Sequence, residues 1–135
     1  MLNPSTATAD VDDPTIRRCI CFSKHWNFGK LIVLNLFTYR STDPRALAVV
    51  PDPVGPENDD YTRCAFARAS EVICAWGCQQ HLRVPLLRAR PAAVVELIPP
   101  GIPVSCLGFR EDGAPRHPLF VPGVSPRQAF SPSLK

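Results

Sequence analysis

The 135-residue sequence has little that marks a membrane protein or a metal-binding protein. Its longest apolar run, 31–37, is interrupted by Asn35 and is far shorter than the ~20 residues of a membrane-spanning helix. None of the six cysteines belongs to a C-x-x-C pair, and the cysteine and histidine spacings match no zinc-finger pattern. We therefore expect a cytoplasmic protein with reduced thiols, no membrane partner, no metal site and no cofactor.

Signatures of several enzyme classes are missing as well. The sequence has no G-x-S-x-G nucleophile motif, no phosphate-binding loop and no dinucleotide fingerprint. Its net charge of +3 is too small and too dispersed to identify a nucleic-acid binder, because a phosphate-binding surface needs basic residues clustered on one face. Charge therefore neither requires nor excludes a nucleic-acid partner.

What is present predicts one α/β domain. A hydrophobic content of 45% and a charged content of 20% are typical of a globular protein. We expect the domain to cover 1–121 and a Pro/Ser-rich, poorly ordered tail to cover 122–135. Apolar patterns predict buried strands at 31–37, 71–76 and 103–107, separated by helices at 14–26, 45–49, 59–69 and, as two short pieces, 79–98. Strands alternating with helices predict a short parallel sheet in a three-layer α/β/α arrangement.

The opening stretch is a polar loop that leads into a helix. Asn3, Pro4 and Ser5 favour turns, and Asp13 followed by Pro14 is typical of a capped helix start. A loop at a helix N-terminus offers N–H donors to an anion or a polar ligand edge, but it can equally be a capped surface loop. Such a loop should follow a strand, and only two residues precede Asn3, so we expect the first strand to be truncated.

Three further polar residues stand at or after the ends of predicted strands. Asn35 lies near the end of 31–37 and either holds the next loop or binds a ligand, because a buried amide costs roughly 1–3 kcal/mol unless it is paired. Arg40 lies in the loop that follows. His117 comes after the strand 103–107, at the edge where open α/β sheets bind ligands. We expect Asn3, Asn35, Arg40 and His117 to converge on this edge.

Several ordered motifs resemble those of a bacterial and phage family, domain of unknown function 1643. The similarity spans 1 to about 121 and rests on MLNPSTA, DPTIRRC, NLFTYRSTDPRAL, DPVGPEND, AWG and CLGFREDGAPRHPLF. The family has no established activity. Its members typically carry an upstream stretch that ends in an apolar strand running into the L-N-P loop, which agrees with the expected truncation.

A more distant similarity is to the uracil-DNA glycosylase superfamily. The resemblance implies that Asn3 and Pro4, with Ser5, form the water-positioning loop and that Asn35 binds the base edge, with Arg40 in the loop beyond it. It also implies that Phe22 stacks on the base and that His117 stabilises the departing base. Because an amide cannot take a proton from water, Asp10, Asp12 or Asp13 would have to act as the base.

Three functional hypotheses follow. The first is an N-glycosylase-like hydrolase that acts on a nucleobase in nucleic acid or in a nucleoside, with Asn3, Asp13 and His117 as catalytic residues. The second is a nucleotide- or base-binding module without catalysis, favoured because Leu119 and Phe120 replace the Ser-containing loop that grips duplex DNA. The third is a protein-interaction module that uses the Pro-rich segments 50–57 and 121–132. The oligomeric state is not predicted.

Overall fold

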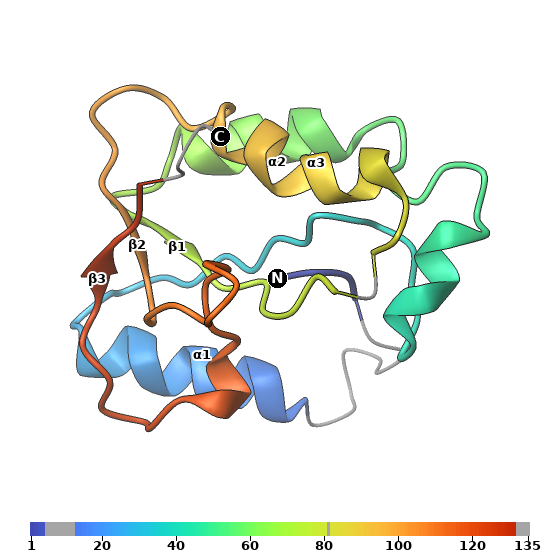
Figure 1. The fold of residues 1–135 in the computed structure, drawn as a ribbon. Helices are drawn as coiled ribbons and strands as arrows, with labels where there is room; N and C mark the ends of the chain where they lie inside the picture. The colour runs from blue at the N-terminus through green and yellow to red at the C-terminus, as the bar shows by residue number, and fades with distance from the viewer. Residues whose placement is uncertain (5–12, 81, 132–135) are drawn as a thin grey trace.

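The computed structural model describes residues 1–4, 13–80 and 82–131. It confirms the expected α/β class, with helices around a small sheet (Figure 1). The elements in chain order are α1 (Pro14–His25), η1 (Pro44–Ala48), α2 (Asn58–Phe66), β1 (Val72–Cys74), α3 (Pro85–Val95), β2 (Val104–Cys106), η2 (Pro118–Phe120) and β3 (Gln128–Ala129).

The sheet is mixed, which corrects the prediction of a parallel sheet. β1 pairs with β2 in parallel, with Val72 opposite Val104. β3 pairs with β2 in the antiparallel sense, with Ser105 opposite Ala129. β3 comes from the segment that the sequence assigned to the tail, and the next residue, Phe130, is buried in the core. Burial of this aromatic ring and the pairing of β3 with β2 both help to offset the ordering entropy of the segment.

The run 31–37 is not a strand, which corrects a second prediction. Its C-terminal half is held by the first residues of the chain, whereas Leu31 and Ile32 remain 38% and 43% exposed. A strand needs a partner for its main-chain N–H and C=O groups, and among the described residues only Met1 and Leu2 form main-chain hydrogen bonds with this run. The three main-chain hydrogen bonds run from Met1 to Leu34 (2.9 Å), from Leu36 to Met1 (3.0 Å) and from Phe37 to Leu2 (3.0 Å).

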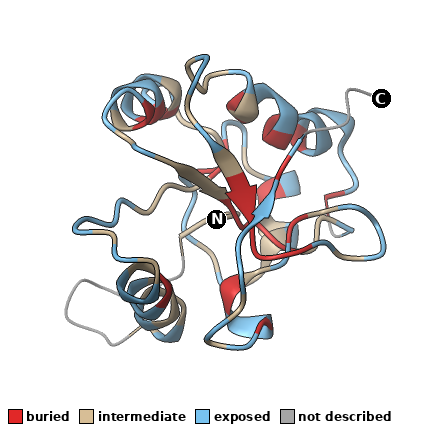
Figure 2. Ribbon diagram, turned by 90° about the vertical axis from the view of Figure 1, so that its left-hand side faces the viewer, coloured by how far each residue is buried: buried red, intermediate tan, exposed pale blue. Residues whose placement is uncertain are grey.

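Helices lie on both sides of the sheet, with α2 and α3 on one side and α1 on the other (Figure 1). Figure 2 shows that the buried residues gather on the sheet and on the inward faces of these helices. The predicted start of α1 is confirmed: an Asp13 carboxylate oxygen accepts hydrogen bonds from the N–H groups of Thr15 (2.7 Å) and Ile16 (3.4 Å), and Pro14 is the first helical residue. No helix within the described ranges is long and apolar enough to cross a membrane.

The buried face of α2 carries two polar residues. Asn58, Thr62 and Phe66 are buried, whereas Tyr61 is 68% exposed. The Asn58 side-chain amide donates to the carbonyl oxygen of Leu36 at 3.0 Å. This polar contact sets the rotation of the helix about its axis, and apolar spacing alone does not predict it.

α3 is a single helix that runs through Pro91, although the sequence predicted two short helices. The residue before this proline, Arg90, is buried and binds two other parts of the chain. Its Nε–H donates to the Leu36 carbonyl oxygen at 2.9 Å, and its terminal nitrogen binds an Asp59 carboxylate oxygen at 2.6 Å. These contacts hold the helix in place across the position where proline removes one intrahelical hydrogen bond.

Candidate functional site

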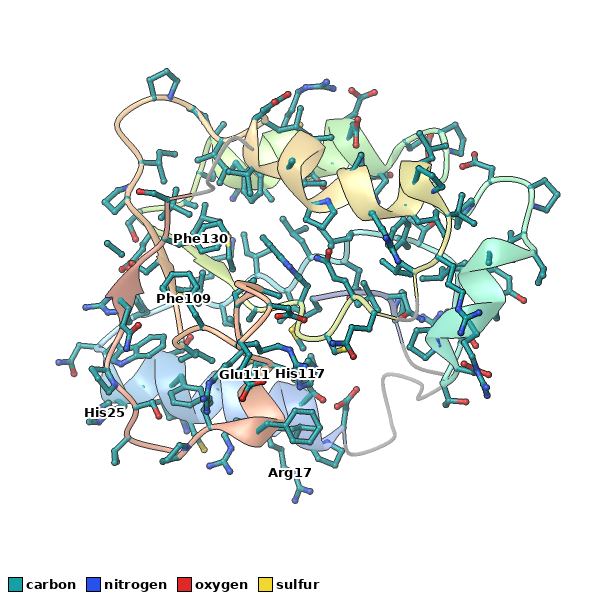
Figure 3. The ribbon with its side chains drawn as sticks, in the orientation of Figure 1. Arg17, His25, Phe109, Glu111, His117 and Phe130 are labelled. Carbon is teal, nitrogen blue, oxygen red and sulfur yellow. The ribbon has the colours of Figure 1, made fainter. Side chains whose placement is uncertain are left out.

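A polar cavity of about 440 Å³ lies beyond the carboxyl ends of β1 and β2. One wall follows β1 and the other follows β2, so the cavity occupies the edge where open α/β sheets bind ligands. Glu111 and His117, which both line this cavity, are labelled in Figure 3. The lining residues are Gly77, Cys78, Gln80, Arg110, Glu111, Asp112, Arg116, His117 and Phe120.

A hairpin turn after β2 supplies the charged wall of the cavity. Phe109 and Pro115 form an isolated antiparallel bridge, and Arg110 N–H donates to the Ala114 carbonyl oxygen at 2.8 Å. Within the turn, an Asp112 carboxylate oxygen lies 3.4 Å from Arg110 Nε. The hairpin therefore presents guanidinium and carboxylate groups next to each other on one short loop.

His117 is the N-cap of η2, and this role fixes its tautomer. Its Nδ1 accepts a hydrogen bond from the Leu119 main-chain N–H at 3.3 Å, so the neutral ring carries its proton on Nε2. Burial lowers the pKa of His117 below its ordinary value of 6.5; the nearby Met1 ammonium also lowers it, while the Asp13 carboxylate opposes the shift. At neutral pH the cavity therefore contains an uncharged imidazole with one N–H donor.

Phe120 gives the cavity an exposed aromatic ring. Its side chain is 76% exposed, and its ring centroid lies 5.6 Å from that of His117 with a tilt of 47° between the planes. An apolar ring held at the surface beside an imidazole is suited to stacking against a planar ligand. Among the described residues, no group of three or more His, Cys, Asp or Glu side chains is placed to hold a metal ion.

Gly77 brings the loop after β1 against His117. Its φ is +76°, and a Cβ at this position would lie 2.9 Å from the His117 Cβ. Its N–H donates to the Pro115 carbonyl oxygen at 3.0 Å. The two walls of the cavity therefore meet at a point where no side chain fits.

The Gly77→Ala variant is expected to lower the free energy of unfolding by about 1–3 kcal/mol and to displace His117, because the new methyl group collides with it in a left-handed backbone. Urea unfolding and the NMR shifts of the His117 ring measure the two effects. Gly113→Ala is the matched control, since Gly113 has φ +78° but a Cβ added there would meet nothing within 4 Å. Equal losses in the two variants would show that contact with His117 does not matter.

Of the three residues predicted to be catalytic, His117 lines the cavity, whereas Asp13 does not. Asp13 lies at the start of α1, which contacts η2. Asn3 lines neither this cavity nor the larger apolar groove, of about 490 Å³, between the segment 30–36 and β1. Its side-chain amide donates to the carbonyl oxygens of Ser41 (2.8 Å), Pro4 (3.2 Å) and Tyr39 (3.4 Å). The amide thus holds the loop at 39–41.

The predicted ligand-binding residues do not line the polar cavity. Asn35 lines the separate apolar groove, and its carbonyl oxygen accepts from the Asn58 amide at 3.3 Å. Phe22 is 2% exposed and stacks on Trp26 with a centroid distance of 5.2 Å. Pro4 is half-buried, Arg40 is exposed in the loop after Asn35, and Ser5 lies outside the described residues.

Sequence reasoning missed most of the cavity. It assigned no ligand contact to Glu111, Arg116 or Phe120. The available signal was a charged turn placed directly after a buried strand, followed by an aromatic residue three positions beyond His117. Such a turn at the carboxyl end of a strand is where ligand-contacting residues gather.

Comparison with known proteins identifies a family but no activity. Residues 1–119 match the model of a family described as "Protein of unknown function (DUF1643)". No curated protein and no solved structure matches the chain. Because the matched region covers most of its length and includes both the hairpin turn and His117, the chain belongs to the DUF1643 family.

Proposed function

We propose that the polar cavity binds a nucleoside or nucleotide through its base, without catalysis. The observation that carries this proposal is the pairing of an uncharged imidazole donor with the exposed ring of Phe120. A planar base can stack on Phe120 while a base carbonyl or ring nitrogen accepts from Nε2 of His117. This arrangement needs no metal ion and no side chain in an unusual protonation state.

The charged side chains of the cavity suit the rest of such a ligand. Glu111 and Asp112 can accept hydrogen bonds from an exocyclic amine or a sugar hydroxyl. Arg110 and Arg116 can bind a phosphate, for which the planar guanidinium group is well shaped. Because the two charge signs are balanced here, we expect a nucleoside to bind nearly as well as its monophosphate, with the base supplying most of the affinity.

Hydrolysis of an N-glycosidic bond is the second candidate. The contact between α1 and η2 favours it, because Asp13 is the N-cap of α1 and His117 is the N-cap of η2. In that reaction Asp13 would take a proton from the attacking water, and His117 would donate to the departing base. Binding without catalysis is favoured because Oδ1 of Asp13 caps α1 and Asn3 is engaged by the loop at 39–41. This second candidate also implies that the fold is a three-layer arrangement like that of the uracil-DNA glycosylases.

The Phe120→Ala variant is expected to weaken nucleoside binding about 5- to 100-fold, the loss that removal of one stacking ring produces. Thermal shift with a panel of nucleobases, nucleosides and nucleotides identifies the ligand, because binding raises the unfolding midpoint by mass action. Titration of the best ligand then compares the variants. Tyr61→Ala is the matched control, because Tyr61 is 68% exposed and lines neither cavity. Equal losses in both variants, or no shift with any ligand, would contradict the proposal.

A turnover assay separates the two candidates. The protein is incubated with nucleosides and with uracil-containing single- and double-stranded oligonucleotides, and free base and abasic sites are measured. Binding of a ligand without release of free base supports the proposed binding without catalysis. Release that is lost in both His117→Ala and Asp13→Asn would instead establish the hydrolase.

A further inference from the structure

The aromatic ring of Phe130, the residue after β3, contacts the residue that precedes each wall of the polar cavity. It lies edge-on to Trp76, with ring centroids 5.6 Å apart, and Trp76 directly precedes Gly77, where one wall begins. It also stacks on Phe109 at a centroid distance of 6.0 Å (Figure 3), and Phe109 directly precedes Arg110, where the other wall begins. Phe130 is 9% exposed, so one buried ring connects the bases of the two walls.

The short strand β3 positions this ring. Gln128 pairs with Cys106 of β2 in the antiparallel sense, and the Phe130 N–H donates to the Val104 carbonyl oxygen at 2.9 Å. Both residues of β3 are exposed, so their side chains contribute little packing. Because a strand of two residues makes few hydrogen bonds, its position depends on the side chains at its two ends.

At the other end of β3, Arg127 is bound by a carboxylate and two aromatic rings. Its guanidinium group forms an ion pair with Glu71, and the Ser105 hydroxyl donates to the other oxygen of the same carboxylate at 2.6 Å. The guanidinium carbon lies 5.2 Å from the ring centroids of both Trp26 and Phe28, close enough for cation–π attraction. Glu71 directly precedes β1 and both rings follow α1, so Arg127 attaches the start of β3 to two other elements.

We propose that residues 127–130 form a clasp that sets the separation of the two walls of the polar cavity, with Phe130 as the positioning residue and Arg127 as its anchor. This inference rests on the proposed binding of a base in that cavity. None of the four residues lines the cavity, so the clasp acts through Trp76 and Phe109. The match to the family model ends before the clasp, so membership of the family does not imply it.

A hydrogen bond between the walls reports on their separation. The Gly77 N–H donates to the Pro115 carbonyl oxygen at 3.0 Å, and Pro115 closes the hairpin that carries the charged wall. Loss of the Phe130 ring leaves Trp76 and Phe109 without their common contact, so this bond should open more often and the ligand should bind more weakly. Because coupling is reciprocal, a bound ligand should in turn protect the Phe130 amide from hydrogen exchange.

The test compares Phe130→Leu with Phe66→Leu. Phe66 is buried to a similar extent, at 6% exposed, but does not line the polar cavity, so this control carries the same loss of a core ring and the accompanying loss of stability. We expect Phe130→Leu to speed hydrogen exchange of the Gly77 amide and to weaken binding of the best nucleoside, each about 2- to 30-fold relative to Phe66→Leu. Equal exchange rates of the Gly77 amide, or equal affinities, in the two variants would overturn the proposal.

A second pair of variants tests the anchor without a change in the core. Arg127→Ala should act in the same direction as Phe130→Leu. Arg45→Ala is its control, because Arg45 is paired with Asp43 at 2.9 Å but is 77% exposed. The exchange of the Gly77 amide is measured without ligand, so if no nucleoside binds, the proposed function fails while the exchange rates still decide whether the clasp exists. An unchanged exchange rate in Arg127→Ala would also overturn the proposal.

Discussion

Replacing Arg90 with methionine is expected to lower the free energy of unfolding by about 2–3 kcal/mol. Arg90 is 8% exposed, donates to the Leu36 carbonyl oxygen at 2.9 Å and pairs with Asp59 at 2.6 Å. Methionine fills a similar volume but leaves the Asp59 carboxylate without this partner. Urea unfolding at neutral pH measures the change.

The surface pair of Arg63 and Asp60 supplies the control. Their nitrogen–oxygen distance is 2.9 Å, but the side chains are 54% and 80% exposed, so Arg63→Met should have a far smaller effect. The hydrogen bond from Arg90 lowers the pKa of Asp59 below its ordinary value of 3.8. The stabilisation that this hydrogen bond gives is present at neutral pH and is lost as the pH falls through the lowered pKa. The difference in free energy of unfolding between wild type and Arg90→Met should therefore become smaller in acid. Equal losses of unfolding free energy in Arg90→Met and Arg63→Met would show that burial of Arg90 is not important.

The free energy of unfolding is expected to rise by about 2–3 kcal/mol between pH 6 and pH 8. Burial lowers the pKa of the Met1 amine from 8.0 to about 6, with smaller opposing effects of Cys74 and Cys19. In this window the unfolded chain holds a proton that the folded chain has released, so stability increases as the pH rises. His117 adds a change of the same sign below pH 6.5, because its pKa is also lowered. Urea unfolding at intervals of half a pH unit gives the slope of the free energy of unfolding against pH.

Acetylation of the N-terminus separates the two groups. The acetylated chain has no amine to titrate, so only the smaller His117 contribution should remain, and His117→Gln should remove that as well. An acetylated chain that keeps the whole slope would show that the amine is not the group responsible.

Some of the fold follows from local sequence. Asp13 and Pro14 define the start of α1, because a carboxylate cap and a φ-locked first residue act within one turn. The apolar runs around β1 and β2 place these strands correctly, since a short run without alternation is typical of a buried parallel strand. Local sequence also placed His117 beyond the carboxyl end of β2, where it lines the polar cavity, because that position depends only on the order of strand and loop.

Distant contacts decided the rest, because pairing and burial depend on residues far apart in the chain. The apolar run 31–37 has the composition of a strand, but a strand exists only where a partner supplies hydrogen bonds. In the part of the chain that the structure describes, only Met1 and Leu2 supply main-chain hydrogen bonds to it. Asn3 and Asn35 look like site residues in the sequence, yet the one holds a loop and the other lines the apolar groove. Phe120 becomes a candidate ligand contact only because η2 holds it against His117 at the surface.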